Sequence, residues 1–366
     1  MKSGIIKNSN SEPLYRWVFR KKDKLDEIVF FFISLTNANN ARYEPLFEFT
    51  DNVRIVYFKG LRLKYTDRIT LYLFRKFMIF FRHQINKYQV LHLFSLSTTF
   101  KNRIQVQHID DPLYSKSEVS ALKLWQDATI NNNGIPVLIC TNQYSFNWYS
   151  NILIKTKVKI IEQGFYESIK LDSHNPKKIF TCVYSSPYIH YGDDLHGMHS
   201  TWGAHILIDQ IIPKLFEADP DIQIWLIGKL GRNALKKLSK YSNWHSFGRV
   251  GLFQNQEIIS KCNVGIYPRL IDHKRSILKI FSYLGGGLPV VTFDLIDTSI
   301  VKEYELGPVV SNVEDFVTSI LELKHSPDLV KLYKDNIEKL NSKFTWRELS
   351  RKMQLELGTL KKQQSF

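Results

Sequence analysis

One stretch, KRSILKIFSYLGGGLPVV at residues 274–291, constrains the fold more than any other part of the chain. Its apolar side chains recur at helical spacing, at Ile277, Ile280, Phe281 and Leu284. This spacing predicts a helix over 276–284 with one buried face. The glycines that begin at Gly285 stop the helix, and the apolar run 288–293 is typical of a strand buried in a parallel sheet. A helix followed at once by such a strand predicts an α/β domain.

The opposite face of this predicted helix is polar and carries a cation. Ser276, Lys279 and Ser282 lie on it, and Lys274 and Arg275 precede it. The backbone N–H groups at a helix N-terminus attract anions, and the two cations add to that attraction. The stretch therefore predicts one wall of a phosphate-binding cleft. Ser276 either donates to a phosphate or caps the helix.

Length and charge narrow the possible classes of protein. A chain of 366 residues exceeds what one core usually supports, so we expect two domains. The net charge of +15 indicates an anionic partner, which is nucleic acid, an anionic membrane surface or a phosphorylated substrate. Composition alone does not choose among these three.

Cysteine usage and hydropathy indicate the compartment. Cys140, Cys182 and Cys262 are far apart and show no Cys-x-x-Cys or Cys/His metal spacing, so we expect reduced core residues and no metal site. Because the N-terminus is polar we expect no secretory leader, and because no window reaches about 18 apolar residues without charge we expect no transmembrane helix. We expect a cytoplasmic protein whose membrane contact, if it has one, is peripheral.

Predicted strands and helices alternate along the whole chain. The strands are expected at 27–35, 52–58, 89–94, 103–107, 137–141, 157–161, 179–185, 222–228, 244–247, 264–267, 288–293 and 307–310. In the second half the helices between them are expected at 201–216, 233–240, 254–262, 276–284 and 313–323. This alternation predicts two parallel, helix-flanked sheets. The polar run 171–178 is the expected linker, so the domains are predicted at 1–172 and 173–345.

Two basic segments of the first half also carry aromatic side chains. Tyr15–Lys22 is expected to be irregular, and Thr66–Lys87 is predicted to be an amphipathic helix. Aromatic residues that enter the headgroup region and cations that meet anionic lipid would make both membrane-binding segments. The alternative for the helix is a core-packing element with a solvated face.

Polar residues follow several predicted strands, where open α/β sheets place ligands. Asp110 and Asp111 come after the strand 103–107, beside His108, and either provide a general base or form an Asp-Asp-Pro turn. Asn37 lies in the loop after the first strand. Further candidates at or near strand ends are Gly164, Gly228, Lys229 and Arg269. Gly164 either lets the backbone approach a ligand or serves a tight turn.

The motif helix and the strand after it resemble the donor domain of GT-B glycosyltransferases, chiefly the large retaining family of group 1 (family 4-like) enzymes. That family commonly has K-hydrophobic-F-E-Y-L-x-x-G-x-P-V-V, and this chain has Lys279 to Val291 with Ser282 in place of the glutamate. The segments ICTNQY and IEQGFY are similar to those before the family's interdomain linker. The helix at 346–366 resembles the one that packs back on the N-terminal domain.

This chain also departs from that family. The family's paired glutamates would fall on Lys274 and Ser282, and neither is acidic. The pattern is similar to a bacterial glucuronosyltransferase of exopolysaccharide assembly, whose base is an aspartate of the first domain. That resemblance assigns the base to Asp111. It also makes Tyr283 a candidate to replace the missing glutamate beside the ribose.

The resemblance implies the GT-B fold, with two Rossmann-like domains facing a cleft. It implies a hexosyltransferase that moves sugar from a nucleotide-diphosphate donor, of UDP or GDP type, to a lipid-linked or polysaccharide acceptor hydroxyl at the inner membrane surface, without metal or cofactor. The catalytic residues would be Asp111, His108 and Asp110. The donor would contact Lys279, Arg269, Ser276, Ser282, Arg275, Lys274, Gly228, Lys229 and Tyr283. The acceptor or hinge would involve Gly164 and Asn37.

Two other classes of function compete with this hypothesis. The missing glutamates fit a catalytically silent GT-B subunit that binds a partner or an acceptor. Nucleic-acid binding would explain the charge, but the chain has no RRM, KH, helix-turn-helix or zinc-finger pattern. We therefore expect no nucleic-acid partner.

Overall fold

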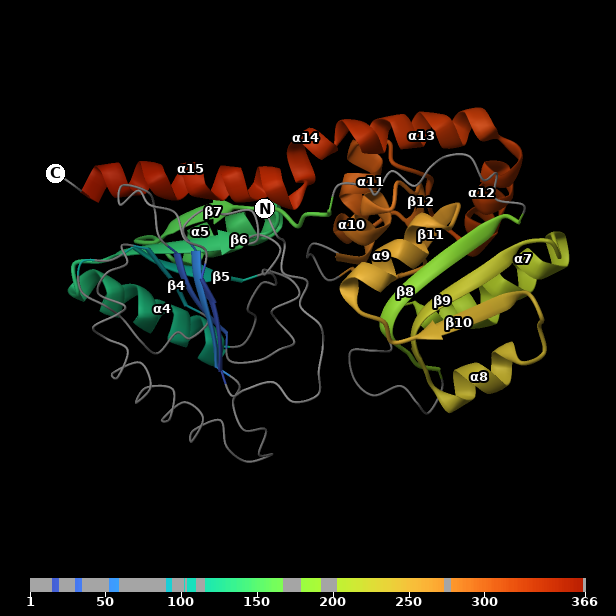
Figure 1. Ribbon diagram of the computed structural model, residues 1–366, viewed down its shortest axis with the longest axis horizontal. Helices are drawn as coiled ribbons and strands as arrows, with labels where there is room; N and C mark the ends of the chain where they lie inside the picture. Colours follow the sequence, from blue (N-terminus) through green and yellow to red (C-terminus); the bar gives the residue numbers. More distant parts are fainter. Residues whose placement is uncertain are drawn as a thin grey trace. The chain divides into compact units, whose positions relative to one another are not determined.

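The computed structural model forms two compact units (Figure 1). Unit 1 comprises residues 1–161 with 350–366, and unit 2 comprises Glu162–Leu349. The residues that the structure describes are 15–19, 30–34, 53–58, 90–93, 102, 104–109, 116–166, 179–191, 203–272 and 278–364. The division after Ile161 comes earlier than the expected boundary at Asp172, and the expected linker at 171–178 lies outside the described residues.

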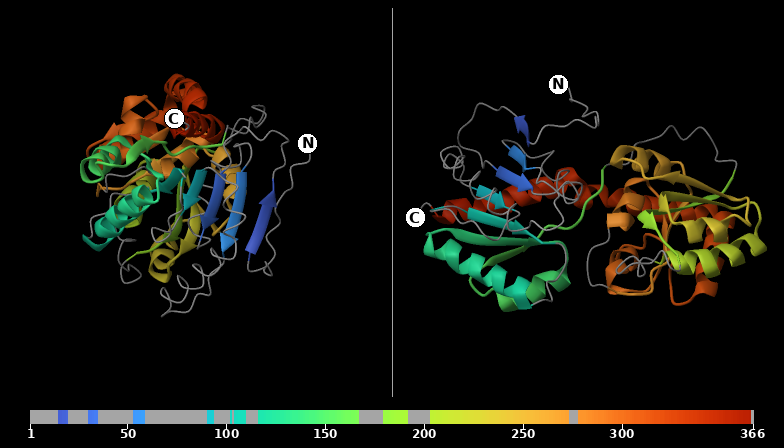
Figure 2. Two further views of the ribbon diagram at one scale, coloured as in Figure 1. Left: turned by 90° about the vertical axis from the view of Figure 1, so that its left-hand side faces the viewer. Right: turned by 90° about the horizontal axis from the view of Figure 1, so that it is seen from below.

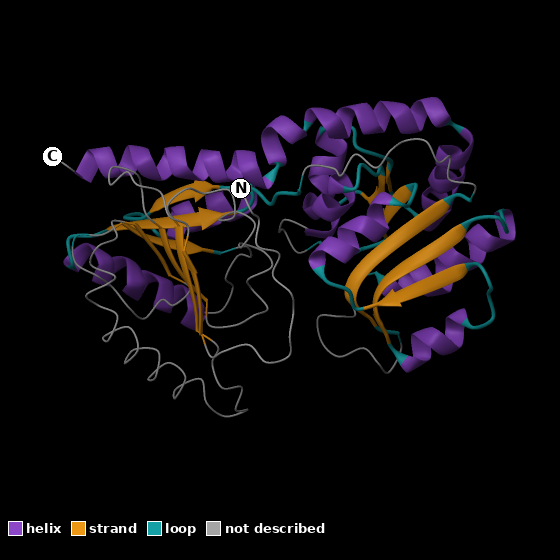
Figure 3. Ribbon diagram, viewed as in Figure 1, coloured by secondary structure: helices purple, strands orange, loops and turns teal. Residues whose placement is uncertain are grey.

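Unit 1 contains a sheet in the order β1-β3-β2-β4-β5-β6-β7. Its strands are β1 (Tyr15–Phe19), β2 (Phe30–Ser34), β3 (Val53–Phe58), β4 (Val90–Leu93), β5 (Ile104–His108), β6 (Ile135–Cys140) and β7 (Lys157–Ile160). All neighbouring strands are parallel except β1, which is antiparallel to β3. The described helices are α4 (Lys116–Asn131), α5 (Gln143–Ile152) and the C-terminal part of α15 (Trp346–Gln364). From β5 to β7 the described strands and helices alternate as expected (Figure 3).

One part of the N-terminal prediction is wrong, and another lies outside the described residues. Tyr15–Phe19 forms the edge strand β1, paired in register with β3 from Tyr15↔Phe58 to Phe19↔Arg54. Its aromatic and β-branched residues Tyr15, Trp17, Val18 and Phe19 suit a strand, although the cations among them suggested irregular structure. The predicted amphipathic helix Thr66–Lys87 lies outside the described residues.

Unit 2 contains a wholly parallel sheet in the order β10-β9-β8-β11-β12-β13. Its strands are β8 (Thr181–Ile189), β9 (Gln223–Leu230), β10 (Trp244–Gly248), β11 (Val264–Tyr267), β12 (Val290–Phe293) and β13 (Val309–Val310). Its described helices are α6 (Ala204–Ile206), the π turn Leu207–Ile211, α7 (Ile212–Ala218), α8 (Arg232–Leu238), α9 (Leu252–Ser260), α10 (Leu278–Gly285), a 3-10 turn (Ile296–Thr298), α11 (Ser299–Glu303), α12 (Val313–His325), α13 (Pro327–Lys339), α14 (Asn341–Phe344) and the start of α15.

Two apolar clusters cover the two faces of this sheet, with helices on both sides (Figure 2). Successive residues of β8 alternate between them: Cys182 and Tyr184 belong to one cluster, and Val183 belongs to the other. This arrangement confirms the doubly wound parallel sheet expected from the sequence. The buried face of α10, which includes Ile280, Phe281 and Leu284, also matches the periodicity prediction.

Two details of unit 2 differ from the expected elements. The strand β8 continues to Ile189, beyond the expected end at Ser185, because an irregularity between Ser185 and Tyr188 lets its pairing with β9 resume. The predicted helix at 201–216 contains a π turn just before Pro213. Proline lacks the N–H that would continue an α-helical ladder, and the wider π turn accommodates that loss.

The order of the strands reverses direction within unit 2. The first strand of this sheet, β8, lies between β9 and β11, so the chain winds outward in both directions from it. Ligands of open α/β sheets bind at the carboxyl ends of the strands that flank such a reversal. The fold therefore points to the segments that follow β8, β9 and β11.

The net charge is divided unequally between the units. Glu162–Leu349 holds 22 Lys and Arg against 22 Asp and Glu, whereas the rest of the chain holds 28 against 13. The whole net charge of +15 therefore belongs to unit 1. Any long-range attraction of the protein to an anionic surface must come from unit 1.

An ion pair that ties α12 to the end of α7 predicts a pH-dependent stability. Asp219 Oδ2 lies 2.5 Å from Lys324 Nζ. Burial alone would raise the pKa of Asp219, but hydrogen bonds from Lys324 and from the backbone N–H of Asp221 outweigh it and lower this pKa below its usual value. A lowered folded-state pKa gives stability that is present above the unfolded-state pKa and is lost as pH falls through the folded-state pKa.

Asp219→Asn should therefore lower the urea midpoint at pH 7, and the difference from wild type should shrink towards pH 3. Equilibrium unfolding at both pH values measures this. Asp335→Asn, at an exposed carboxylate, is the matched control and should change the midpoint little. An Asp219→Asn effect of equal size at both pH values would show that the ion pair is not its cause.

Candidate functional site

Two glycines allow the strand ends of unit 2 to approach closely. Gly228, at φ +142°, lies against the backbone of Ser186, and a Cβ built on Gly228 would stand 1.7 Å from that carbonyl oxygen. Gly203, at φ +81°, lies in the same way against Pro268, with 2.0 Å between the added Cβ and the carbonyl oxygen. Only glycine fits either position. At the reversal point of the sheet, β9 therefore lies close against β8, and the segment after β8 lies close against the segment after β11.

A tyrosine hydroxyl fills the gap where β8 and β11 separate. The two strands pair only from Cys182 to Val183 on the β8 side. Beyond that, Tyr283 Oη accepts from the backbone N–H of Ser185 at 2.9 Å and donates to the carbonyl oxygen of Ile266 at 3.2 Å. The Tyr283 ring lies against Gly265, where a Cβ would come within 2.5 Å of it. The sequence hypothesis placed Tyr283 beside the ribose, whereas the structure places it inside the scaffold, fully buried.

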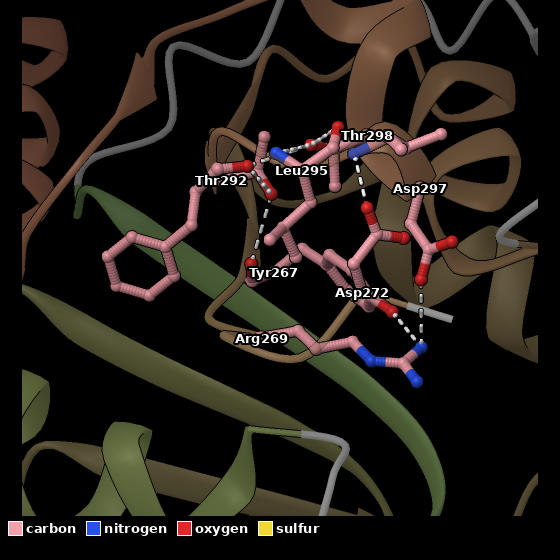
Figure 4. Close-up of polar contacts among 9 residues, drawn as sticks. Tyr267, Arg269, Asp272, Thr292, Leu295, Asp297 and Thr298 are labelled. Atoms are coloured by element: carbon pink, nitrogen blue, oxygen red, sulfur yellow. Dashed lines mark hydrogen bonds and ion pairs between the residues drawn. The ribbon is translucent and has the colours of Figure 1, made fainter. Parts of the chain in front are cut away.

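Arg269 is the first charged residue after β11, and its side chain is only 2% exposed. Its Nη1 atom donates to Tyr267 Oη at 3.0 Å and lies 3.6 Å from Asp297 Oδ2, whose carboxylate is fully buried (Figure 4). These contacts join the segment after β11 to the turn after β12.

The turn after β12 is itself held in place by polar contacts. Asp272 Oδ2 accepts from the backbone N–H of Ile296 at 2.9 Å, and Thr298 Oγ1 donates to the carbonyl oxygen of Phe293 at 2.7 Å (Figure 4). Asp297 is therefore presented to Arg269 from a fixed backbone. The sequence analysis did not select Asp297, although it follows a predicted strand end by only four residues.

Lys279 projects from the first turn of α10 over two tyrosine rings. Its Nζ atom is shielded from solvent and lies 5.2 Å from the centroid of the Tyr184 ring and 5.9 Å from that of Tyr267. Burial and the neighbouring Tyr267 raise the pKa of Tyr184 well above its usual value, although a hydrogen bond with Ser186 and the charge of Arg269 oppose this. The Tyr184 phenol therefore lines the site as a neutral group, and the faces of both rings stabilise the cation.

Two other predicted donor-site residues have clear surroundings. Ser282 Oγ donates to the carbonyl oxygen of Leu278 at 3.0 Å, within its own helix. A serine bonded in this way satisfies its hydroxyl proton locally. Lys229 is the second-last residue of β9, and its side chain is exposed. Position 282 carries a serine and not the glutamate of the resembled family, so it offers no acidic contact. Among the described residues, Lys229 has no close partner.

Gly164 is explained by packing. A Cβ built on it would come within 2.8 Å of the side chains of Trp346 and Leu349. It does not have the positive φ that the tight-turn alternative requires, so that alternative is wrong. Close packing of the segment 162–166 against the start of α15 accounts for the glycine, and its assignment to acceptor or hinge stays a prediction.

The remaining predicted site residues fall outside what the structure describes. His108 ends β5, but its side chain is not described. The others that lie outside the described residues are Asn37, Asp110, Asp111, Lys274, Arg275 and Ser276. The structure therefore brings Arg269 and Lys279 to opposite parts of Tyr267, its hydroxyl and its ring, and it adds Tyr184 and Asp297 to them.

Neither a metal centre nor a membrane span is found in the part of the chain that the structure describes. Within these residues, no group of three or more His, Cys, Asp or Glu side chains is arranged to hold a metal ion. In the same part of the chain, no helix has the length and apolar character needed to cross a bilayer.

Comparisons with known proteins identify the architecture. No family model matches this chain, and no curated protein matches it significantly in sequence. Solved structures do match. A glycosyltransferase from Rickettsia africae is 10% identical with a TM-score of 0.67, over 91% of this chain and 98% of the other. HepE from Anabaena, in complex with UDP and glucose, is 12% identical with a TM-score of 0.61, over 91% and 100%. The chain has the GT-B fold.

A third solved structure with the GT-B fold is larger than this chain. TarM from S. aureus, in complex with UDP, α-GlcNAc-glycerol and fondaparinux, is 13% identical with a TM-score of 0.54. The match covers 72% of this chain and 54% of TarM, so the chain spans about half of TarM. At these identities the likeness concerns the fold, and it confirms the two Rossmann-like domains expected from the sequence.

The close approach at Gly228 gives a test of the strand-end geometry. Gly228→Ala should destabilise the protein by more than about 2 kcal/mol, because its Cβ would overlap the carbonyl oxygen of Ser186 at an unfavourable φ. Differential scanning calorimetry measures the loss. Gly251→Ala, at φ −72° with open space around the added Cβ, is the matched control. Equal melting temperatures for the two variants would contradict the close packing of β9 on Ser186.

Proposed function

We propose that this protein is a glycosyltransferase that uses a nucleotide-diphosphate sugar. One observation carries the proposal: at the strand-end reversal point of a GT-B unit, the Arg269 side chain is buried and the Nζ atom of the half-buried Lys279 is shielded from solvent. Buried positive charge at such a crevice favours a polyanionic ligand, and the diphosphate of a nucleotide sugar is one.

The site suggests how transfer would proceed. The acceptor hydroxyl oxygen attacks the anomeric carbon as the bond from that carbon to the diphosphate oxygen breaks, and the nucleoside diphosphate leaves with the bonding electron pair. Lys279 and Arg269 would stabilise the negative charge that develops on the leaving group. A base would remove the proton from the acceptor hydroxyl. We assign this role to Asp111, assisted by Asp110 and His108, on the sequence resemblance alone.

The similar structures support the choice of donor and acceptor classes. HepE binds UDP and glucose, and TarM binds UDP together with α-GlcNAc-glycerol, in which the sugar is attached to an alcohol hydroxyl. By analogy we propose a UDP- or GDP-linked hexose as donor and a hydroxyl of a lipid-linked or polysaccharide molecule as acceptor. No metal or cofactor is part of the proposal.

The division of charge supports a place at the cytoplasmic membrane surface. Unit 1 holds the entire net charge of +15, and it is the unit in which we place the acceptor site and the segments Tyr15–Lys22 and Thr66–Lys87. A basic unit attracts anionic lipid, with each cation near the surface worth about 1 kcal/mol. Among the described residues, Lys155 and Lys157 are exposed beside Ile154, which is 83% exposed.

Nucleotide binding tests the proposed function directly. UDP, GDP or TDP should raise the melting temperature by a few degrees in a thermal-shift series. Lys279→Gln should weaken the binding of the active nucleotide at least about tenfold, because a buried cation facing the diphosphate is lost. Lys236→Gln, at an exposed lysine of α8, is the control.

Two results would change the conclusion. If none of the three nucleotides stabilised the folded protein, the donor-site assignment would be wrong. If a nucleotide bound but no sugar transfer or donor hydrolysis followed with lipid or polysaccharide acceptors, the catalytically silent subunit would be the better description.

Vesicle sedimentation tests the membrane proposal. The double variant Lys155→Gln/Lys157→Gln should bind vesicles of 30:70 anionic to zwitterionic lipid about thirtyfold more weakly than wild type, because two cations at about 1 kcal/mol each contribute about 2 kcal/mol. Lys236→Gln/Lys240→Gln removes the same charge from unit 2 and should bind as wild type does. Binding of wild type that is insensitive to salt, or equal binding to DNA, would refute an electrostatic membrane contact.

A further inference from the structure

Arg269 has hydrogen-bond donors that the protein does not use. Its Nε and Nη2 atoms are shielded from solvent and have no acceptor among the described residues, while its Nη1 atom is held by Tyr267 and Asp297. Buried polar groups nearly always have partners, and an unsatisfied charged donor is especially costly. The two atoms together form the side edge of the guanidinium, which presents two parallel N–H groups. This edge matches two oxygens of one carboxylate or phosphate.

We propose that the side edge of Arg269 binds the distal phosphate of the donor diphosphate through two parallel hydrogen bonds, and that Tyr267 and Asp297 are positioning residues for this contact. The inference rests on the proposed function and specifies how one part of that site works. Lys279 supplies a point charge, whereas Arg269 supplies a fork of fixed geometry, so the two cations have different roles.

Tyr267 can act on both cations because it contacts both. Its hydroxyl accepts from Arg269 Nη1 at 3.0 Å, and its ring lies 5.9 Å from Lys279 Nζ. The hydroxyl fixes which edge of the guanidinium remains available. The ring supports the ammonium from one side, which leaves the spacing between the two cations set by a single side chain.

Asp297 completes the placement of the fork. Its carboxylate lies beside Nη1, so its charge holds the guanidinium at that end. The edge formed by Nε and Nη2 is not used by this contact. An ion pair with both partners buried is firm only when its geometry is fixed, and the turn after β12 supplies that through the contacts of Asp272 and Thr298. An oxyanion that reached the edge formed by Nε and Nη2 would meet desolvated donors, so the contact would be strong.

The ratio of UMP to UDP dissociation constants in the full-length protein tests the proposal. UDP carries the distal phosphate and UMP lacks it, so wild type should bind UDP at least about tenfold more tightly. Arg269→Lys keeps the charge and removes the fork, and it should lower this ratio by about tenfold with little change for UMP. Isothermal titration calorimetry measures both constants. If guanine nucleotides bind instead, GDP and GMP replace the uracil pair.

The positioning residues have a separate signature. Tyr267→Phe removes the hydroxyl but keeps the ring under Lys279, and Asp297→Asn keeps the shape without the charge. Both should weaken UDP binding several-fold and leave UMP binding unchanged, whereas general destabilisation would weaken both nucleotides. Arg249→Lys alters another Arg–Tyr pair of unit 2, in which Arg249 Nη1 lies 3.2 Å from Tyr188 Oη. It should leave the UMP/UDP ratio as in wild type.

Three outcomes separate the possible errors. If wild type bound no nucleotide, the proposed function itself would fail. If wild type preferred UDP and Arg269→Lys kept the full preference, only this inference would be overturned. Should Arg269→Lys not fold, Tyr267→Phe gives the same test. If the UMP/UDP ratio were unchanged but glucuronate bound beside UDP in wild type and not in Arg269→Lys, the fork would serve a sugar carboxylate, which would overturn the phosphate assignment.

Discussion

The contact of Arg269 with Tyr267 and Asp297 joins the segments that follow two neighbouring strands, β11 and β12. It is a charged contact in an interior position, and its partners would be expensive to bury separately. The segments on both sides of this contact are held by further contacts. The turn that carries Asp297 is fixed by Asp272 and Thr298. The backbone of Pro268, next to Arg269, lies against Gly203 at the start of α6. The polar part of the site is therefore built from residues that hold one another.

Much of unit 2 follows from the sequence because its signals are periodic. The apolar repeat of 276–284 and the run 288–293 identify α10 and β12, and the alternation of strands and helices gives the doubly wound sheet. Two strands were harder to predict because their extent or existence depends on hydrogen bonding to a neighbouring strand. The strand β8 extends past Ser185 only where β9 offers a partner, and β1 exists by pairing with β3 despite its cations.

The site was only partly predictable for a related reason. Lys279 could be selected because it lies on the polar face of the motif helix, and Arg269 because it is a cation just after a predicted strand. Asp297 could not, because it acts through a contact with a segment remote in sequence, and Tyr267 could not, because a strand pattern does not show that its hydroxyl contacts Arg269. Tyr283 was assigned to the ligand because it adjoins Ser282 in the motif, yet a one-residue step along a helix turns a side chain by about 100°. That step takes it from the polar face into the core.

The hydroxyl of Tyr283 bridges the backbones of β8 and β11 at the point where their own pairing ends. Two strand ends joined through a fully buried ring cannot spread apart independently. The walls of the crevice are therefore preorganised, and the conformational entropy of ordering them is lost when the protein folds and not when a ligand arrives. A phenol in the interior would in this way contribute to affinity without touching the ligand.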